Sequence, residues 1–237
     1  MYLDSFHTVQ NDLIQITPEQ GSRFAKEVSD DFNPLHNPDS KRFCVPGDLL
    51  FSLVLAKMGL SKKMAFNYTG MVGKGVEIAM PATEALTFTV KDNKDKAYLD
   101  VTRSDDSSHN LALIEQFSRA YVAFSGHSFP HILVPLMEQN KVMINPDRPM
   151  VIYESMAFEF DHLDISKPKL SLALKDTQLE ANGKRGQVRI EFDICNGNDI
   201  IGHGFKTMVL SGLRPYDAEK VSALIELYEQ SKQAYSA

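Results

Sequence analysis

The stretch PGDLLFSLVLAKMGLS, residues 46–61, does most to decide the fold. Between Leu49 and Leu55 it is apolar nearly all the way around a helix, whereas a surface helix is apolar along one face only. A helix of this kind needs cover on several sides, because none of its faces is suited to water. The stretch therefore predicts a buried helix with other elements packed around it.

Segments rich in strand-forming residues follow this helix. Residues 75–92, 96–106 and 110–125 contain many Val, Leu, Phe, Tyr and Thr residues, and turn-like stretches, DNKDK and SDDSSHN, separate them. Strands that follow one another without crossover helices favour antiparallel pairing. We therefore expect all three segments, including 110–125, to form antiparallel strands.

A second cycle of helix and strands follows the first. Residues 129–142 are a helical apolar run opened by Pro130, and residues 216–234 form an amphipathic helix at the end of the chain. Four strand candidates lie between them, at residues 150–163, 169–182, 187–197 and 200–213. The order predicts an α+β protein with two units of similar size, residues 1–125 and residues 126–237, which pack closely because no low-complexity linker separates them.

Composition excludes several classes of partner. The 237 residues carry a formal net charge of -6 at pH 7 and no Lys/Arg-rich run, which argues against nucleic acid and anionic membranes as partners. The two cysteines, Cys44 and Cys195, form no C-x-x-C pair, and no stretch reaches the roughly 18 apolar residues of a membrane span. We expect a cytoplasmic protein without a disulfide framework.

A polar loop lies between two expected helices. Thr17, Pro18 and Gln20 have the spacing of a capping box with proline at the first helical position, which predicts a helix from residue 18. The stretch SDDFNPLHNPDSKRF follows, and its prolines, Pro34 and Pro38, disfavour helix in the residues before them. The simplest interpretation is a polar turn with a surface imidazole.

The same loop also has the groups for acid–base chemistry. A carboxylate, Asp31, and an imidazole, His36, held on one rigid loop can share a water molecule, with one group taking its proton and the other delivering a proton elsewhere. SDDFNPLHNPDSKRF and the apolar helix after it resemble the hydratase 2 motif of MaoC-like proteins, the (R)-specific enoyl-CoA hydratases, usually S-G-D-x-N-P-[LI]-H. The resemblance covers about residues 15–60.

The resemblance implies a fold and a set of site residues. Its fold is the hotdog, a long helix wrapped by an antiparallel sheet, and two cycles in one chain imply a double hotdog in which residues 126–237 stand where a second subunit would stand. Asp31 and His36 would be the catalytic pair that activates water, with Asn33 and Ser29 in support. Backbone N–H groups of Gly47, Asp48 and Leu49 would polarise a thioester carbonyl.

The resemblance also implies the ligand. An acyl thioester of CoA or acyl carrier protein would be hydrated or dehydrated, without metal or redox cofactor, because the thioester itself acidifies the α-carbon. One site per chain is expected, in a monomer with an internal pseudo-dimer or in a homodimer.

Two departures from the motif bear on this expectation. Asp30 replaces its usual glycine, and Asp48 stands where the family has glycine at the start of the long helix. A carboxylate there favours the helix dipole but opposes an oxyanion nearby.

Three functions stay open at this point: a hydratase or dehydratase, a thioesterase on the same fold with Asp31 directing water at the thioester carbon, and a non-catalytic acyl-thioester binding or regulatory protein. His127 and His131, four residues apart, have the spacing of a metal pair on a helix, but Pro130 lies between them and no third ligand is near, so a metal site is not expected.

Overall fold

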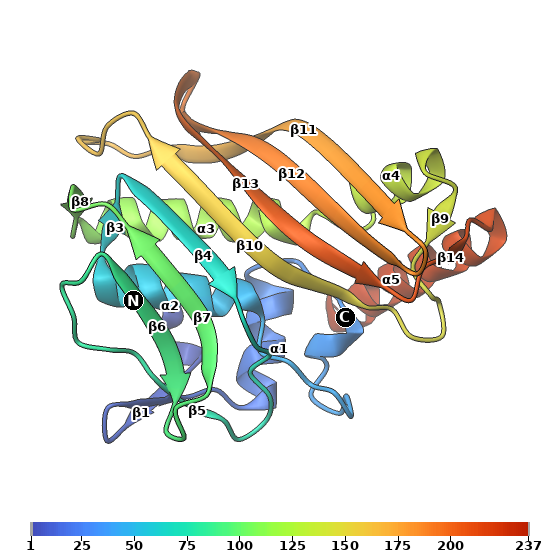
Figure 1. Cartoon of the computed structure of the whole chain (residues 1–237), viewed down its shortest axis with the longest axis horizontal. Helices are drawn as coiled ribbons and strands as arrows, with labels where there is room; N and C mark the ends of the chain where they lie inside the picture. Colours follow the sequence, from blue (N-terminus) through green and yellow to red (C-terminus); the bar gives the residue numbers. More distant parts are fainter. Residues whose placement is uncertain (1, 237) are drawn as a thin grey trace.

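One antiparallel sheet curves around two long helices, α2 and α3, in the computed structural model of the chain, which describes residues 2–236 (Figure 1). Ten strands form the sheet in the order β1-β2-β5-β6-β7-β4-β10-β13-β12-β11. Each half of this order is one helix-wrapping sheet of the hotdog kind, and the two join edge to edge. The chain is therefore an α+β double hotdog.

The elements have the following bounds. The helices are α1 (Pro18–Glu27), α2 (Gly47–Met58), α3 (Leu111–Gly126), α4 (Leu133–Gln139) and α5 (Ala218–Ser236), with two 3-10 helices, η1 (Tyr2–Ser5) and η2 (Pro34–His36). The strands of the large sheet are β1 (Thr8–Gln10), β2 (Leu13–Gln15), β4 (Lys63–Tyr68), β5 (Glu77–Ala79), β6 (Thr87–Asp92), β7 (Ala97–Arg103), β10 (Val151–Phe160), β11 (Leu170–Asn182), β12 (Arg185–Asn196) and β13 (Asp199–Ser211). Two small pairs join β3 (Leu60–Ser61) to β8 (Ser107–Ser108) and β9 (Val142–Met143) to β14 (Arg214–Pro215).

The predicted buried helix is confirmed as α2. Its side chains are buried without interruption from Asp48 to Leu55. Phe51 packs against Tyr121 of α3 with ring centroids 4.6 Å apart, against Phe66 of β4 at 5.2 Å, and against Phe158 of β10 at 6.4 Å. Aromatic rings from both half-sheets and from the second helix therefore meet on one side chain, which explains why α2 has no polar face.

The capped helix before the polar loop is also confirmed. In α1 the Gln20 backbone N–H donates to Thr17 Oγ1 over 3.2 Å, and the Thr17 N–H donates to Gln20 Oε1 over 2.9 Å. This reciprocal pair satisfies two donors that have no partner within the helix.

The prediction of a strand at residues 110–125 is wrong, because these residues form α3. Asn110 caps the helix, since its Oδ1 accepts from the N–H groups of Ala112 and Leu113 over 3.0 and 3.3 Å. Leu113, Phe117 and Tyr121 recur every four residues on the buried face. The strand prediction followed from the content of Leu, Phe, Tyr and Val, whereas the spacing of these residues is helical.

The long helix that the second half-sheet covers is therefore α3 and not the predicted helix at 129–142. The predicted helical run at 129–142 contains only the seven residues of α4, and the long helix against which β11 packs is α3. The four predicted strands are confirmed as β10 to β13, and the C-terminal helix as α5. The expected boundary between residues 125 and 126 falls at the last residue of α3.

The two half-sheets are joined by β4 and β10. These strands pair antiparallel from Ser155 with Asn67 to Glu159 with Lys63, and Lys63 Nζ lies 2.7 Å from Glu159 Oε1 at the end of the ladder. Neither strand is an edge, so the sheet runs across both halves without interruption. The expected pseudo-dimer is thus held together by backbone hydrogen bonds as well as by core packing.

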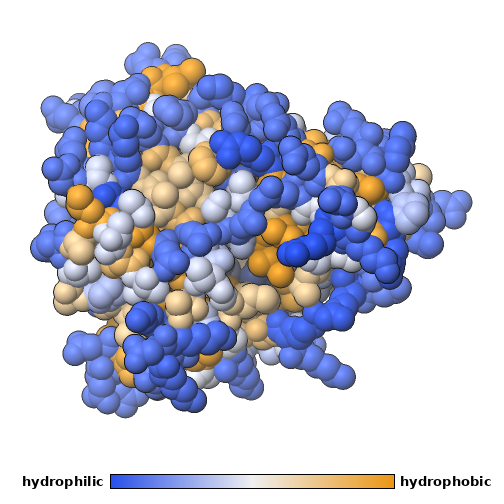
Figure 2. Space-filling model, in the orientation of Figure 1, coloured by the Kyte–Doolittle hydropathy of each residue, from blue (hydrophilic) through white to orange (hydrophobic). Residues whose placement is uncertain are grey.

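The sheet buries one face only. Along β12 the buried side chains alternate with more exposed ones, and Val188, Ile190, Phe192 and Ile194 point inward. On the opposite face hydrophilic residues predominate around the rim, and groups of apolar residues show between them across the middle (Figure 2). Within residues 2–236, no helix combines the length and the hydropathy needed to cross a membrane.

Candidate active site

The polar loop leaves α1 by a backbone conformation that few residues adopt. Asp30 has φ of 55°, in the left-handed region where glycine is least strained and Asp or Asn is tolerated. The next N–H, that of Asp31, donates to the Ala25 carbonyl oxygen over 2.8 Å. The side chain of Asp30 pairs with Lys232 of α5, so the adjacent carboxylates of Asp30 and Asp31 serve different partners.

Asn33 fixes the shape of the loop. Its N–H donates to Asp31 Oδ1 over 2.9 Å, and its own Oδ1 accepts from the Leu35 N–H over 3.1 Å, which starts the 3-10 turn η2. One oxygen of the Asp31 carboxylate is thereby held by the backbone, and the other, Oδ2, faces His36. The expected supporting role of Asn33 corresponds to these two hydrogen bonds.

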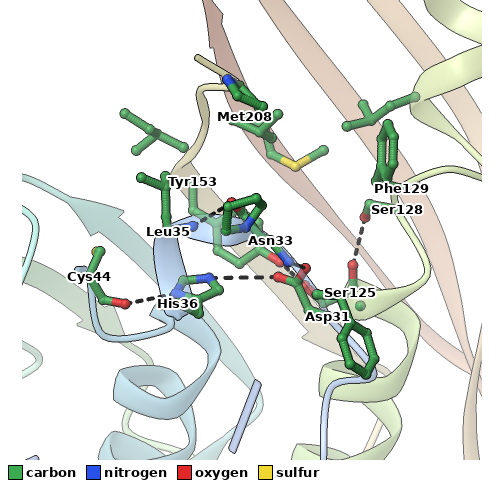
Figure 3. Close-up of a pocket in the computed structure, with 18 of the residues that line it drawn as sticks. Asp31, Asn33, Leu35, His36, Cys44, Ser125, Ser128, Phe129, Tyr153 and Met208 are labelled. Carbon is green, nitrogen blue, oxygen red and sulfur yellow. Dashed lines mark hydrogen bonds and ion pairs between the residues drawn. The ribbon is translucent and has the colours of Figure 1, made fainter. Parts of the chain in front are cut away.

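The His36 ring is held by the backbone at Cys44. His36 Nδ1 lies 2.7 Å from the Cys44 carbonyl oxygen, which can only accept, so Nδ1 carries the proton. In the neutral ring Nε2 is then an acceptor, and it lies 3.7 Å from Asp31 Oδ2. Figure 3 shows the two side chains facing each other. The gap is longer than a direct hydrogen bond and suits a water molecule that binds both groups.

Asp31 and His36 lie on the wall of a cavity of about 290 Å³ between the two halves of the chain. The loop, the start of α2 and the end of α3 form one side. The second half, including α5, contributes apolar side chains, among them Leu133, Ile144, Val151, Met208 and Leu224. The cavity therefore presents Asp31 and His36 on one side, beside hydroxyl groups of Ser125, Ser128 and Tyr153, and largely apolar side chains on the other.

The three residues expected to polarise a carbonyl lie in different surroundings. Gly47 lines the cavity, and its carbonyl oxygen accepts from the Tyr68 hydroxyl over 3.0 Å. Leu49 is buried in the core, and its N–H donates to the Pro46 carbonyl oxygen over 3.0 Å. Asp48 is 3% exposed, is not part of the cavity wall and makes no side-chain cap to its own helix.

Asp48 instead belongs to a buried polar cluster with Tyr153, Ser125, Ser128 and Lys206. Its Oδ2 accepts from the Tyr153 hydroxyl over 3.2 Å, and its Oδ1 has no partner within residues 2–236. Tyr153 Oη is hydrogen-bonded to Ser125 Oγ. Lys206 Nζ donates to Ser125 Oγ over 3.0 Å and to Ser128 Oγ over 2.7 Å. Two opposite charges are thus buried together, joined through hydroxyl groups.

Burial shifts the pKa values of both charged groups toward neutrality. It raises the pKa of Asp48 to about 6, although the Lys206 cation opposes this shift. It lowers the pKa of Lys206 to about 8, with Asp48 and Asp31 acting in the opposite direction. Burial likewise raises the pKa of Tyr153 well above its usual value, so that this hydroxyl keeps its proton.

These shifts predict a pH dependence of stability. Between about pH 4 and 6 the folded chain keeps the Asp48 proton that the unfolded chain has lost, so this group's contribution falls as pH rises, by roughly 3 kcal/mol in total. Asp48→Asn should remove this slope. Urea unfolding of both proteins across pH 4–7 measures it, and a constant difference between them would contradict the shift.

Ser29 and Gly126 form a tight contact behind the loop. A Cβ atom on Gly126 would lie 1.4 Å from the Ser29 carbonyl oxygen, so the end of α3 meets the loop backbone where only glycine fits. The Ser29 side chain is 1% exposed, and its Oγ has no partner among the described residues. Ser29 therefore lies beneath the site and does not line the cavity.

Sequence reasoning missed Tyr153, Ser125, Ser128 and Lys206. Only Lys206 had a local signal, because the alternation along β13 puts it on the same inward face as Met208 and Leu210. A lysine at an inward position of an apolar strand indicates a buried charge that needs partners.

The expected absence of a histidine metal site stays a prediction. The rings of His127 and His131 stack with centroids 5.8 Å apart. No group of three or more His, Cys, Asp or Glu side chains in residues 2–236 is placed to hold a metal ion.

Several solved structures share the layout of this fold. They include a conserved protein of unknown function with a hotdog fold from Alicyclobacillus acidocaldarius (TM-score 0.47, 10% identity, 89% of this chain and 98% of that one). A MaoC-like dehydratase is also similar, with a TM-score of 0.44 and 8% identity over 87% of this chain and 98% of that one. The acyl-CoA thioesterase II TesB2 from Mycobacterium marinum has a TM-score of 0.42 and 10% identity over 89% of this chain and 96% of that one. All three TM-scores are below 0.5, so no activity is transferred from these proteins.

Comparisons of the sequence, in contrast to those of the structure, identify a family. No curated protein matches it. One family model matches residues 1–219, which is most of the chain and includes the loop, both long helices and the whole sheet. The chain therefore belongs to the DUF3581 family, whose description is "protein of unknown function".

Proposed function

We propose that the protein is a hydratase or dehydratase that adds water to an enoyl thioester or removes it from a 3-hydroxyacyl thioester. The observation that carries this proposal is the 3.7 Å gap between Asp31 Oδ2 and His36 Nε2 on the cavity wall. A water molecule bound by both groups would be positioned beside a ligand that fills the cavity.

The two groups would divide the proton transfers. His36 Nε2, unprotonated in the neutral ring, accepts a proton as the water oxygen bonds to C3 of the enoyl group. The pair then supplies one proton to C2 of the enolate, so that one water molecule is added in total. Dehydration is the same sequence in reverse. Proton transfers of this kind contribute about 10²–10⁴-fold to rate.

The start of α2 would stabilise the enolate oxygen. The first N–H groups of a helix have no partner within it and lie at the positive end of its dipole. Gly47 and Leu50 of this turn line the cavity, and the Tyr68 hydroxyl donates to the Gly47 carbonyl oxygen. Asp48 does not line the cavity, so its carboxylate would not meet the substrate oxygen directly.

The apolar surface contributed by the second half would hold the acyl chain. The acyl carrier would be CoA or acyl carrier protein, and the thioester would supply the acidity that the reaction needs without a metal or redox cofactor. Because both halves of one chain build the cavity, the site would be complete within a single chain.

A panel of trans-2-enoyl-CoA substrates from short to long acyl chains tests the proposal, with enoyl absorbance and free thiol followed in parallel. Loss of absorbance without thiol release is the expected result. Thiol release would instead indicate a thioesterase. Binding of acyl-CoA without either change would indicate a binding or regulatory protein.

A further inference from the structure

The buried polar cluster beside the cavity reaches its wall at Ser125, Ser128 and Tyr153 and contains a cation, Lys206, that the proposed chemistry does not use. Lys206 is 1% exposed, at an inward position of β13. Its ammonium group donates to three oxygen atoms, the carbonyl and hydroxyl of Ser125 and the hydroxyl of Ser128. Every N–H of the ammonium group therefore has a partner, and all three partners belong to the end of α3 or the turn after it.

The hydrogen bonds of the cluster have one consistent direction. The Tyr153 hydroxyl donates to Asp48 Oδ2, so the Ser125 hydroxyl must donate to Tyr153 Oη. The Ser128 hydroxyl donates to the Ser125 carbonyl oxygen over 2.7 Å. Lys206 and Asp48 are thus the two ends of a chain that runs through Ser125 and Tyr153.

Each charge lies at a helix end of the opposite sign, which favours it. Asp48 is in the first turn of α2, at the positive end of its dipole, and Ser125 is in the last turn of α3, where Lys206 binds a terminal carbonyl. Asp48 and Ser125 are joined through Tyr153, and four residues further along α2 Ser52 is hydrogen-bonded to Ser118, seven residues earlier on α3, over 2.8 Å, so the two helices run antiparallel. The start of α2 and the end of α3 therefore meet beside the cavity.

We infer that Lys206 is a positioning residue, which offsets the negative charge of Asp48 so that the start of α2 keeps a positive potential toward a substrate carbonyl oxygen. The inference rests on the proposed function. A buried carboxylate without a counter-charge would cancel the helix dipole at the place where an enolate develops. The chain from Lys206 through Ser125 and Tyr153 places the counter-charge without bringing the ammonium group into the cavity.

The test compares Lys206→Met, Asp48→Asn and the double variant, with Lys175→Met, an exposed lysine of β11, as the control. Without the Lys206 cation the pKa of Asp48 should rise further, so Asp48 carries its charge in Lys206→Met only at higher pH. The kcat of Lys206→Met should therefore fall below that of the wild type as pH is raised, by about 10²-fold where Asp48 is ionised, with a smaller change in KM. Asp48→Asn should retain kcat within about tenfold. The double variant, which lacks both charges, should regain kcat to within about tenfold of the wild type, and Lys175→Met should match the wild type.

Two results would overturn the inference. One is a kcat per folded molecule in Lys206→Met that matches the wild type at every pH at which both proteins stay folded. The other is a double variant whose kcat stays as low as that of Lys206→Met although circular dichroism and urea titration show that it folds. The effect of Lys206 would then not depend on the charge of Asp48. A wild type that hydrates no enoyl thioester would instead contradict the proposed function, and with it the positioning role.

Discussion

Replacing Asp31 with Asn is expected to lower kcat for enoyl-thioester hydration by about 10²–10⁴-fold. The amide keeps the shape of the side chain and can still accept at Oδ1 from the Asn33 N–H, so the loop should stay in place. What it loses is the charged oxygen that faces His36 Nε2 across 3.7 Å. Steady-state rates at saturating substrate, with folding checked by circular dichroism, measure the effect.

Asp30→Asn is the matched control for this experiment. It makes the same chemical change one residue earlier, at a left-handed position that Asn also tolerates, and it removes a pair with Lys232 on the outer side of the loop. Its kcat should stay within a few-fold of the wild type. The kcat of His36→Ala should fall as far as that of Asp31→Asn. Full activity in either of these two variants would exclude the pair as the groups that activate water.

Gly126→Ala is expected to produce the largest loss of stability, about 3–5 kcal/mol. The new methyl group would lie 1.4 Å from the Ser29 carbonyl oxygen and 2.6 Å from its carbonyl carbon. Both atoms belong to the backbone, so no side-chain rotation can relieve the clash, and α3 must move away from the loop. Urea unfolding of the wild type and the variant measures the difference in free energy.

Gly73→Ala separates this clash from a general effect of substituting glycine. A Cβ at Gly73 would lie 3.9 Å from its nearest neighbour, the Phe43 carbonyl oxygen, which is an ordinary contact. Its stability should change by less than about 1 kcal/mol. Equal unfolding midpoints for both variants would mean that α3 and the loop do not approach as closely as the distance indicates.

Local patterns were sufficient to predict much of this fold. The capping box of α1, the apolar circumference of α2 and the alternation along β12 depend on residues a few positions apart, and each is observed. The error at 110–125 had a different origin. The content of Leu, Phe, Tyr and Val there favours a strand, whereas Asn110 and the four-residue repeat of Leu113, Phe117 and Tyr121 are features of a helix.

The pairing of β4 with β10 depends on contacts about ninety residues apart, for which no local pattern exists.

The candidate site likewise has a part that local sequence predicts and a part that it does not. Asp31, Asn33 and His36 could be predicted together because they share one loop. The orientation of the His36 ring depends on the Cys44 carbonyl, and the contacts of Asp48 depend on α3, β10 and β13. The contacts of Asp48 with Tyr153 and, through the hydroxyl groups, with Lys206 arise only when the second half folds onto the first.

The continuous ladder from β4 to β10 affects how this protein can change in evolution. In an assembly of two identical subunits, every substitution appears twice, at symmetry-related places, and must be tolerated at both. Here the strands on the two sides of the junction are encoded once each. A change at Met208, on the apolar wall, leaves the loop of Asp31 untouched in sequence. The width of the cavity can therefore drift while the loop of Asp31 and His36 stays constant.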